Sequence, residues 1–250
     1  MTSQLPISMA TINDLPNELL LEIIPHLTLQ ALIAARAINK KWRMLVAIAY
    51  RDLCPTRRRL LQLYTDTIAS PAFHATRDEI VTHLWPFDRE AYVAALEAAT
   101  PLPLPDDFRM WLLEWPERAV IGWYWPGLTS AYNFQATLAR ATGAYLLERP
   151  DDALGSILLN KDGSVISHRP LRGEDLILND HWVWFVDLHC DPCDRYAITT
   201  SLFIAGKGVG EKVVGQVRYN VVGRLIQSEH GAPCWLDFLR GELRYQESLM

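Results

Sequence analysis

Residues 15–24 read LPNELLLEII, and the apolar spacing of this stretch predicts a helix in the N-terminal part of the chain. Pro16 suits the first turn of a helix, because its missing N–H is not needed there. Apolar side chains then recur every four residues, as they do along one stripe of an amphipathic helix. The stripe consists of Leu15, Leu19, Ile23 and Leu27, and it is widened by Leu20 and Ile24.

Two further apolar runs follow, at residues 29–33 and 42–46. Three segments this short are too small to build a stable core alone. They also expose more apolar surface than they can bury, which is typical of a docking surface. The pattern therefore predicts a small helical module that binds a partner protein.

Residues 12–55 resemble an F-box. The resemblance rests on Leu15-Pro16, Glu18-Leu19, Ile23, Leu27, Arg36, Asn39-Lys40-Lys41-Trp42-Arg43 and Leu45. It implies a three-helix module that docks on the acidic adaptor subunit of cullin-based SCF ubiquitin ligases. The residues predicted to bind that adaptor are Leu15, Pro16, Leu19, Leu20, Ile23, Leu27, Lys40, Lys41, Trp42 and Arg43. Without the resemblance, the same pattern also fits an ordinary three-helix start to a larger domain.

Positive charge is concentrated behind this motif. Between Arg36 and Arg59 there are eight Lys or Arg residues and one acid, Asp52. A solvated helix face would explain this on its own, but the F-box resemblance favours an acidic protein partner. The whole chain carries a formal net charge of -5, which gives no reason to expect nucleic-acid binding.

The composition is that of a globular protein: 50% of the 250 residues are apolar or aromatic and 21% are charged. We see no secretory signal in residues 1–10 and no apolar run of membrane-spanning length. The four cysteines are expected to be free thiols in a reducing compartment. We therefore expect a protein of the cytoplasm, the nucleus or both, with no membrane partner.

The order of expected elements predicts an α+β chain. We expect the F-box module at 10–55, a linker helix at 56–79 and a second domain at 80–250. Helices are predicted at 57–64, 88–99, 106–115 and 131–142, with a closing helix at 233–243. Strands are predicted at 120–125, 182–188, 196–205 and 213–222, and a hairpin at 157–166 turns at Lys161-Asp162-Gly163.

The second domain resembles the SMI1/KNR4 (SUKH) family. The matching residues are Glu90-Ala91-Tyr92, Leu96-Glu97, the run Leu102-Pro103-Leu104-Pro105-Asp106-Asp107-Phe108, and Trp111-Leu112. The family pattern expects an asparagine–glycine turn after the second helix, where this chain has residues 114–117, EWPE. The resemblance implies an α+β binding fold without general catalytic activity, placed behind an F-box as in a class of fungal proteins.

Catalytic and metal motifs are weak. Cys190-Asp191-Pro192-Cys193 is a lone CxxC; a tight hairpin turn explains it best, ahead of a zinc or redox site. The glycines of 206–210 fail the spacing of a phosphate-binding loop, because Glu211 follows them. We therefore predict no catalytic residue, cofactor or metal, and no enzyme.

The nine tryptophans should mostly form core, but tryptophan is also favoured where proteins bind one another. Trp123, Trp125 and Trp184 are the candidates for recognising a client protein. The function expected is that of a non-catalytic substrate receptor of an SCF-type ligase. The alternatives are a SUKH-type scaffold acting outside a ligase and, third, a hydrolase or metal enzyme on the α+β domain.

Overall fold

The structure is a computed structural model that describes residues 11–99, 103–121, 124–128, 154–159, 165–170, 181–190, 197–205, 214–222 and 231–250. The chain divides into two compact units, Met1–Leu61 and Gln62–Met250. The division falls within the expected linker helix, 56–79, and the predicted boundaries at 55 and 80 stay predictions. Helix α5 (Pro71–Thr82) packs against the C-terminal helix, so residues 71–79 pack with the second unit.

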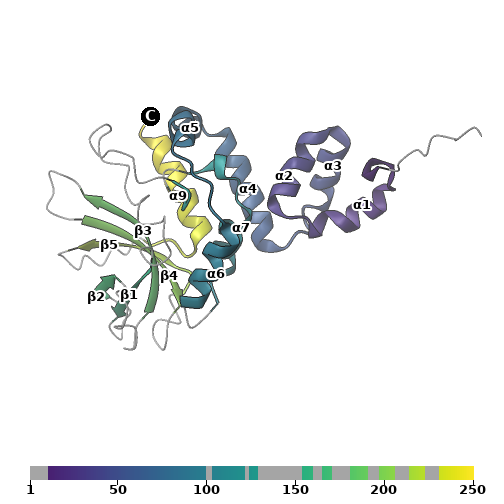
Figure 1. Ribbon diagram of the computed structural model, residues 1–250. Helices are drawn as coiled ribbons and strands as arrows, with labels where there is room; N and C mark the ends of the chain where they lie inside the picture. Colours follow the sequence, from purple (N-terminus) through teal and green to yellow (C-terminus); the bar gives the residue numbers. More distant parts are fainter. Residues whose placement is uncertain are drawn as a thin grey trace, which may run out of the picture. The chain divides into compact units, whose positions relative to one another are not determined.

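Three helices make up the first unit up to residue 49: α1 (Asn17–Ile23), α2 (Leu29–Ile38) and α3 (Lys40–Ala49). A 3₁₀ turn, η1 (Ile12–Asp14), precedes them. Polar caps start the later helices, because Thr28 Oγ1 accepts from the N–H of Ala31 and Asn39 Oδ1 from that of Trp42. Helices α1 and α2 both pack on α3 (Figure 1).

Helix α1 is shorter than the apolar spacing predicts. Pro25 lies in a second 3₁₀ turn, η2 (Ile24–His26), and Leu27 follows in an extended conformation. A proline within a helix removes a hydrogen bond and clashes with the preceding turn. Leu27 therefore does not continue the α1 stripe, and its expected place on that helix was wrong.

Helix α4 (Pro55–Ala69) crosses the division between the units. The second unit then contains α5, α6 (Arg89–Ala99), α7 (Asp106–Glu114), the turn η3 (Glu117–Ala119) and α9 (Trp235–Ser248). Helices α5 and α7 both pack on α9, and Figure 1 shows the helices gathered on one side of the sheet. The helices expected at 57–64, 88–99 and 106–115 and at the C-terminal end of the chain are confirmed.

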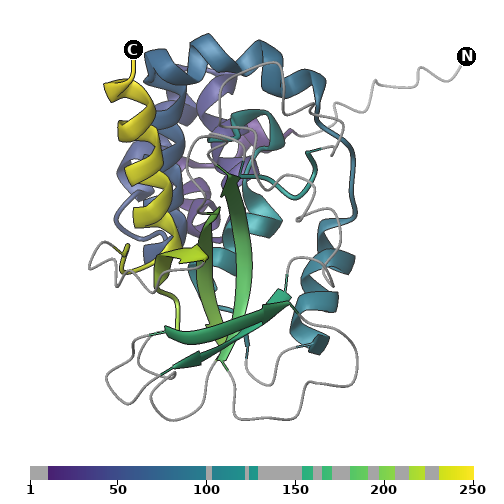
Figure 2. The same ribbon diagram turned by 90° about the vertical axis from the view of Figure 1, so that its left-hand side faces the viewer.

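A five-stranded antiparallel sheet has the order β2-β1-β3-β4-β5 (Figure 2). Its strands are β1 (Leu154–Leu159), β2 (Val165–Pro170), β3 (His181–Cys190), β4 (Ala197–Ala205) and β5 (Val217–Val222). The predicted hairpin is confirmed, because β1 pairs with β2 from Gly155 opposite Pro170 to Leu159 opposite Val165. Strand β3 is central, as expected. Strand β5 starts later than predicted, because Gly215 sits in a turn with φ of 86°.

The strand expected at 120–125 is wrong in its described residues, 120–121 and 124–125. There the chain makes turn-like bonds instead: the Tyr124 N–H donates to the Ile121 carbonyl, and that of Leu128 to the Trp125 carbonyl. The aromatic and branched residues are apolar because they enter a helical core, which periodicity alone does not distinguish from a strand. The helix expected at 131–142 lies outside the described residues.

Aromatic side chains fill the helical core of the second unit. Trp111 packs edge-on against Trp125 and Trp235, with ring centroids 5.2 and 4.9 Å apart. Phe108 packs edge-on against Trp235, and all four rings are buried. Edge-to-face pairs at these distances add stability beyond the area they bury. The chain thus has a helical N-terminal region followed by an α+β unit.

Within the described part of the chain, we find no helix with the length and apolar character needed to cross a membrane.

Candidate functional site

Helix α1 presents two apolar faces to different surroundings. Leu20 and Ile24 are fully buried, whereas Leu19 and Ile23 keep 45% and 38% of their surface exposed. Residues four apart lie on the same face of a helix, so each pair forms one stripe. The inner stripe fills the core of the module, and the outer stripe remains available to a partner.

Trp42 joins the start of α3 to the turn that precedes α1. Its indole Nε1–H donates to Asn13 Oδ1 at 2.7 Å, and Lys41 Nζ donates to the Asn13 carbonyl at 3.3 Å. Trp42 is buried, and so is Leu20. The expectation that these two side chains contact an adaptor directly is therefore corrected: they hold the helices that carry the exposed residues.

The other predicted adaptor-binding residues lie nearer the surface. Pro16, Lys40 and Arg43 are exposed, and Leu15, Leu27 and Lys41 are half-buried. The structure adds a second exposed apolar pair, Met44 and Ile48, on α3. Sequence reasoning missed this pair, although its four-residue spacing beside the buried Leu45 and Ala49 was a usable signal.

The basic residues of this module also serve as local caps. Arg43 Nε donates to the Arg36 carbonyl near the end of α2, and one guanidinium nitrogen of Arg58 donates to the Arg51 carbonyl. Cations suit the carbonyl ends of helices. Part of the positive charge between Arg36 and Arg59 is therefore structural, while Lys40 and Arg43 keep exposed surface that an acidic partner could approach.

One acid in the module is perturbed. The pKa of the Asp14 carboxyl lies below its ordinary value, mainly because the Thr11 backbone N–H donates to it at 2.6 Å. The Thr11 hydroxyl lowers the pKa further, desolvation opposes both hydrogen bonds, and the charge of Lys41 adds the smallest lowering effect. Asp14 is thereby held as an anion that closes the turn before α1.

In the second unit, Trp125 is not available for client recognition. It is fully buried, with Phe87 and Trp111 packed edge-on against it and the Arg89 guanidinium 4.8 Å above its ring. The pKa of Arg89 is lowered by its burial, against the effect of Glu117. Arg89 also donates to the carbonyls of Leu113 and Trp115 at the end of α7. This expectation is therefore corrected, and Trp125 is part of the core.

The two other client candidates stay predictions. Trp123 lies outside the described residues. Trp184 lies in β3, where its backbone pairs with Leu154 and Leu202, but its side chain is outside what is described.

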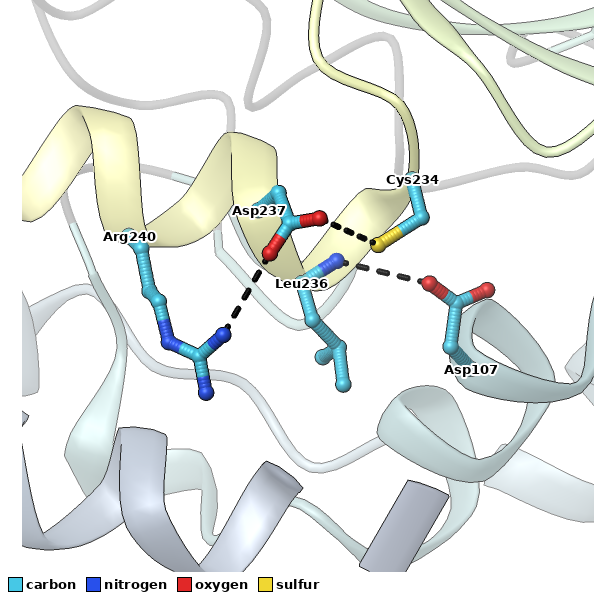
Figure 3. Close-up of polar contacts among 5 residues, drawn as sticks. All are labelled: Asp107, Cys234, Leu236, Asp237 and Arg240. Carbon is cyan, nitrogen blue, oxygen red and sulfur yellow. Dashed lines mark hydrogen bonds and ion pairs between the residues drawn. The ribbon is translucent and has the colours of Figure 1, made fainter. Parts of the chain in front are cut away.

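A polar link joins the starts of α7 and α9 (Figure 3). Asp107 accepts through Oδ1 from the Phe108 N–H and through Oδ2 from the Leu236 N–H, at 2.9 and 3.4 Å. Helix N-termini have unpaired N–H groups and favour a carboxylate. Asp107, part of the Leu-Pro-acid motif, thus joins two helices that are far apart in the sequence.

The thiol of Cys234 donates to Asp237 Oδ2 at 3.2 Å, and Arg240 pairs with the other carboxylate oxygen at 3.3 Å (Figure 3). Cys190 ends β3, while Cys193 and the glycines of 206–210 lie outside the described residues. Among the residues that are described, no three His, Cys, Asp or Glu side chains gather as metal ligands would.

Comparison with known families gives one match: residues 12–56 match the family described as F-box-like. The match covers the first unit from η1 to the start of α4. No curated protein and no solved structure matched the chain.

Proposed function

We propose that this chain is a non-catalytic substrate receptor of an SCF-type ubiquitin ligase. The observation that carries the proposal is the F-box-like match at residues 12–56, in which α1 leaves Leu19 and Ile23 exposed. An F-box-like module connects its own protein to the ligase adaptor. The chain would act in the cytoplasm, the nucleus or both.

The adaptor contact would combine apolar burial with charge. Leu19 and Ile23 are large aliphatic side chains on one helix face, and a partner that covers them removes their apolar surface from water. Lys40 and Arg43 are exposed nearby in sequence and would steer an acidic adaptor into contact. Trp42 and Leu20 would act indirectly, by keeping the helices in place.

The second unit would hold the client. We propose that it is a SUKH-like domain of the kind found in fungal proteins, supported by two helices, a sheet and a closing helix that follow the order the resemblance implies. Its role would be proximity: a client held on the receptor experiences a high effective concentration of the ubiquitin-loaded enzyme. No catalytic group of the receptor is required for this.

The test is co-expression with an SCF adaptor subunit, followed by size exclusion. We expect a one-to-one complex that is lost in the double variant Leu19→Asp/Ile23→Asp. The matched control is Leu249→Asp/Ile68→Asp, because these residues are 44% and 40% exposed but lie in the second unit. The control should keep the complex.

Retention of the complex by Leu19→Asp/Ile23→Asp would refute α1 as the contact. Failure of the folded wild-type chain to bind any adaptor would reject the ligase role. The module would then be a protein-binding element that acts outside a ligase.

A further inference from the structure

Trp85 stands apart from the other tryptophans. It is 66% exposed, whereas each other tryptophan with a described side chain is at most 3% exposed. Those buried tryptophans are Trp42, Trp111, Trp115, Trp125 and Trp235. A single exposed apolar residue is ordinary on a protein surface, so exposure alone carries no argument.

The backbone around Trp85 is held firmly. Its N–H donates to the Gly127 carbonyl, and Leu84 forms a bridge with Leu128. Phe87, two residues on, packs edge-on against Trp125 and against Tyr92 at the start of α6. The segment that carries Trp85 is thus fixed on both sides while its indole points to solvent.

Gly127 makes this arrangement possible. A Cβ at this position would lie 2.7 Å from the Trp85 carbonyl oxygen and 2.9 Å from the Phe87 ring. Only glycine lets the two segments approach so closely. An aromatic side chain on a fixed backbone loses little freedom when it binds, which favours its use as an anchor for a partner.

Exposed carboxylates flank Trp85 in sequence. Asp78 and Glu79 lie near the end of α5, and Asp88 and Glu90 lie at the start of α6. The arginine among these residues, Arg89, is turned toward the carbonyls of Leu113 and Trp115 and toward Glu117.

Two other basic residues, Arg77 and His83, lie close to Trp85 in sequence, and they do not outweigh the four carboxylates. Arg77 is exposed on α5 and lies over the Phe73 ring, and His83 is half-buried after the end of that helix. Residues 78–90 thus carry four carboxylates against one arginine and one histidine, so this segment favours positive charge in whatever binds it.

We propose that Trp85 and the carboxylates of 78–90 form a docking site for a basic, arginine- or lysine-containing segment of a partner protein. A guanidinium or ammonium group would stack on the indole face, the strongest aromatic acceptor of a cation. Neighbouring carboxylates would pair with further basic residues of the segment. This site would select client proteins that carry a basic segment, so the proposal rests on the receptor function proposed above. Its test measures peptide binding and does not involve the adaptor.

Fluorescence anisotropy of labelled peptides on the full chain tests this site. The probes are an Arg-Gly-Ser repeat peptide and its Glu-Gly-Ser counterpart. We expect the basic peptide to bind, and Trp85→Ala to weaken that binding by about 3- to 30-fold, the range of a cation–π contact. Tyr245→Ala is the matched control, since it removes another exposed aromatic side chain, on α9, and should leave affinity unchanged.

A charge variant keeps the test independent of any change in packing. We expect weaker binding of the basic peptide, and a smaller fall of its affinity with added salt, in the quadruple variant Asp78→Asn/Glu79→Gln/Asp88→Asn/Glu90→Gln. In the wild type, the Ala91 N–H donates to Asp88 Oδ1, and the side-chain oxygen of asparagine at position 88 can still accept that hydrogen bond. The melting temperature should stay near that of the wild type.

Binding of the basic peptide that is equal in wild type and Trp85→Ala, or no binding at millimolar peptide, overturns the proposal. Leu19→Asp/Ile23→Asp should bind the peptide like the wild type. Loss of adaptor binding in that variant and loss of peptide binding in Trp85→Ala therefore report on separate claims.

Discussion

Replacement of Gly127 by alanine should destabilise the second unit. The new Cβ would lie 2.7 Å from the Trp85 carbonyl oxygen, 2.9 Å from Phe87 Cδ1 and 3.0 Å from Trp125 Nε1. Favourable contacts between such atoms occur at about 3.5–4.0 Å, so the backbone of one segment has to move. Overpacking of this kind costs about 1–3 kcal/mol. For a chain of this size, that lowers the melting temperature by about 2–12 °C.

Gly241→Ala is the matched control for this substitution. Gly241 lies in α9, is exposed, and has no heavy atom within 4 Å of an added Cβ. Alanine is favoured over glycine within a helix by about 0.5–1 kcal/mol. The same chemical change should therefore raise the melting temperature at 241 and lower it at 127.

Thermal unfolding followed by circular dichroism at 222 nm measures both effects. Near-ultraviolet dichroism reports in addition on Trp125 and Phe87, whose surroundings should change in Gly127→Ala and stay the same in Gly241→Ala. A Gly127→Ala protein that melts at or above the wild-type temperature would refute the close approach. It would also remove the rigid support on which the Trp85 docking site depends.

Three further predictions follow from single contacts. Asp107→Ala removes the acceptor shared by α7 and α9 and should lower the free energy of unfolding, measured in urea, by about 0.5–2 kcal/mol. Asp107→Asn keeps a side-chain oxygen and should lower it less. Equal losses in the two variants would contradict the role of Asp107 as a shared cap. Asn13→Ala leaves the Trp42 indole N–H without its 2.7 Å acceptor and should lower stability by about 0.5–1.5 kcal/mol, with Asn13→Asp milder; a neutral Asn13→Ala would show that the bond adds nothing. Because the folded pKa of Asp14 is depressed, its bonds to Thr11 are present above the ordinary pKa of 3.8 and are lost as pH falls through the lower folded value. An NMR titration of the Thr11 amide should show a midpoint below 3.8 that disappears in Asp14→Asn, and a midpoint at or above that value would reverse the argument.

Local signals in the sequence predicted most elements correctly. The helices predicted at 88–99 and 106–115 are α6 and α7. The Lys-Asp-Gly turn signal in the sequence at 161–163, between two apolar runs, predicted the β1–β2 pair. These features depend on neighbours in sequence, so they can be recognised without the fold.

The errors arose where a local pattern fits two outcomes. The branched and aromatic residues of 120–125 fit a strand, yet the described ones are packed in a helical core. The four-residue spacing from Leu15 to Leu27 ignored Pro25, which ends the helix first. Packing in the helical core overrode the first pattern, and the steric effect of Pro25 overrode the second.

Periodicity, prolines and turn residues act over a few neighbouring residues, so the sequence alone predicted a small helical module followed by an α+β domain. It also marked which side chains are apolar. Which of these side chains face solvent follows from the three-dimensional packing: Leu20 is buried while Leu19 is exposed, and Trp125 is buried while Trp85 is exposed. That choice depends on what packs against each helix and loop, such as Gly127 against Trp85, and those contacts join residues that are distant in the chain.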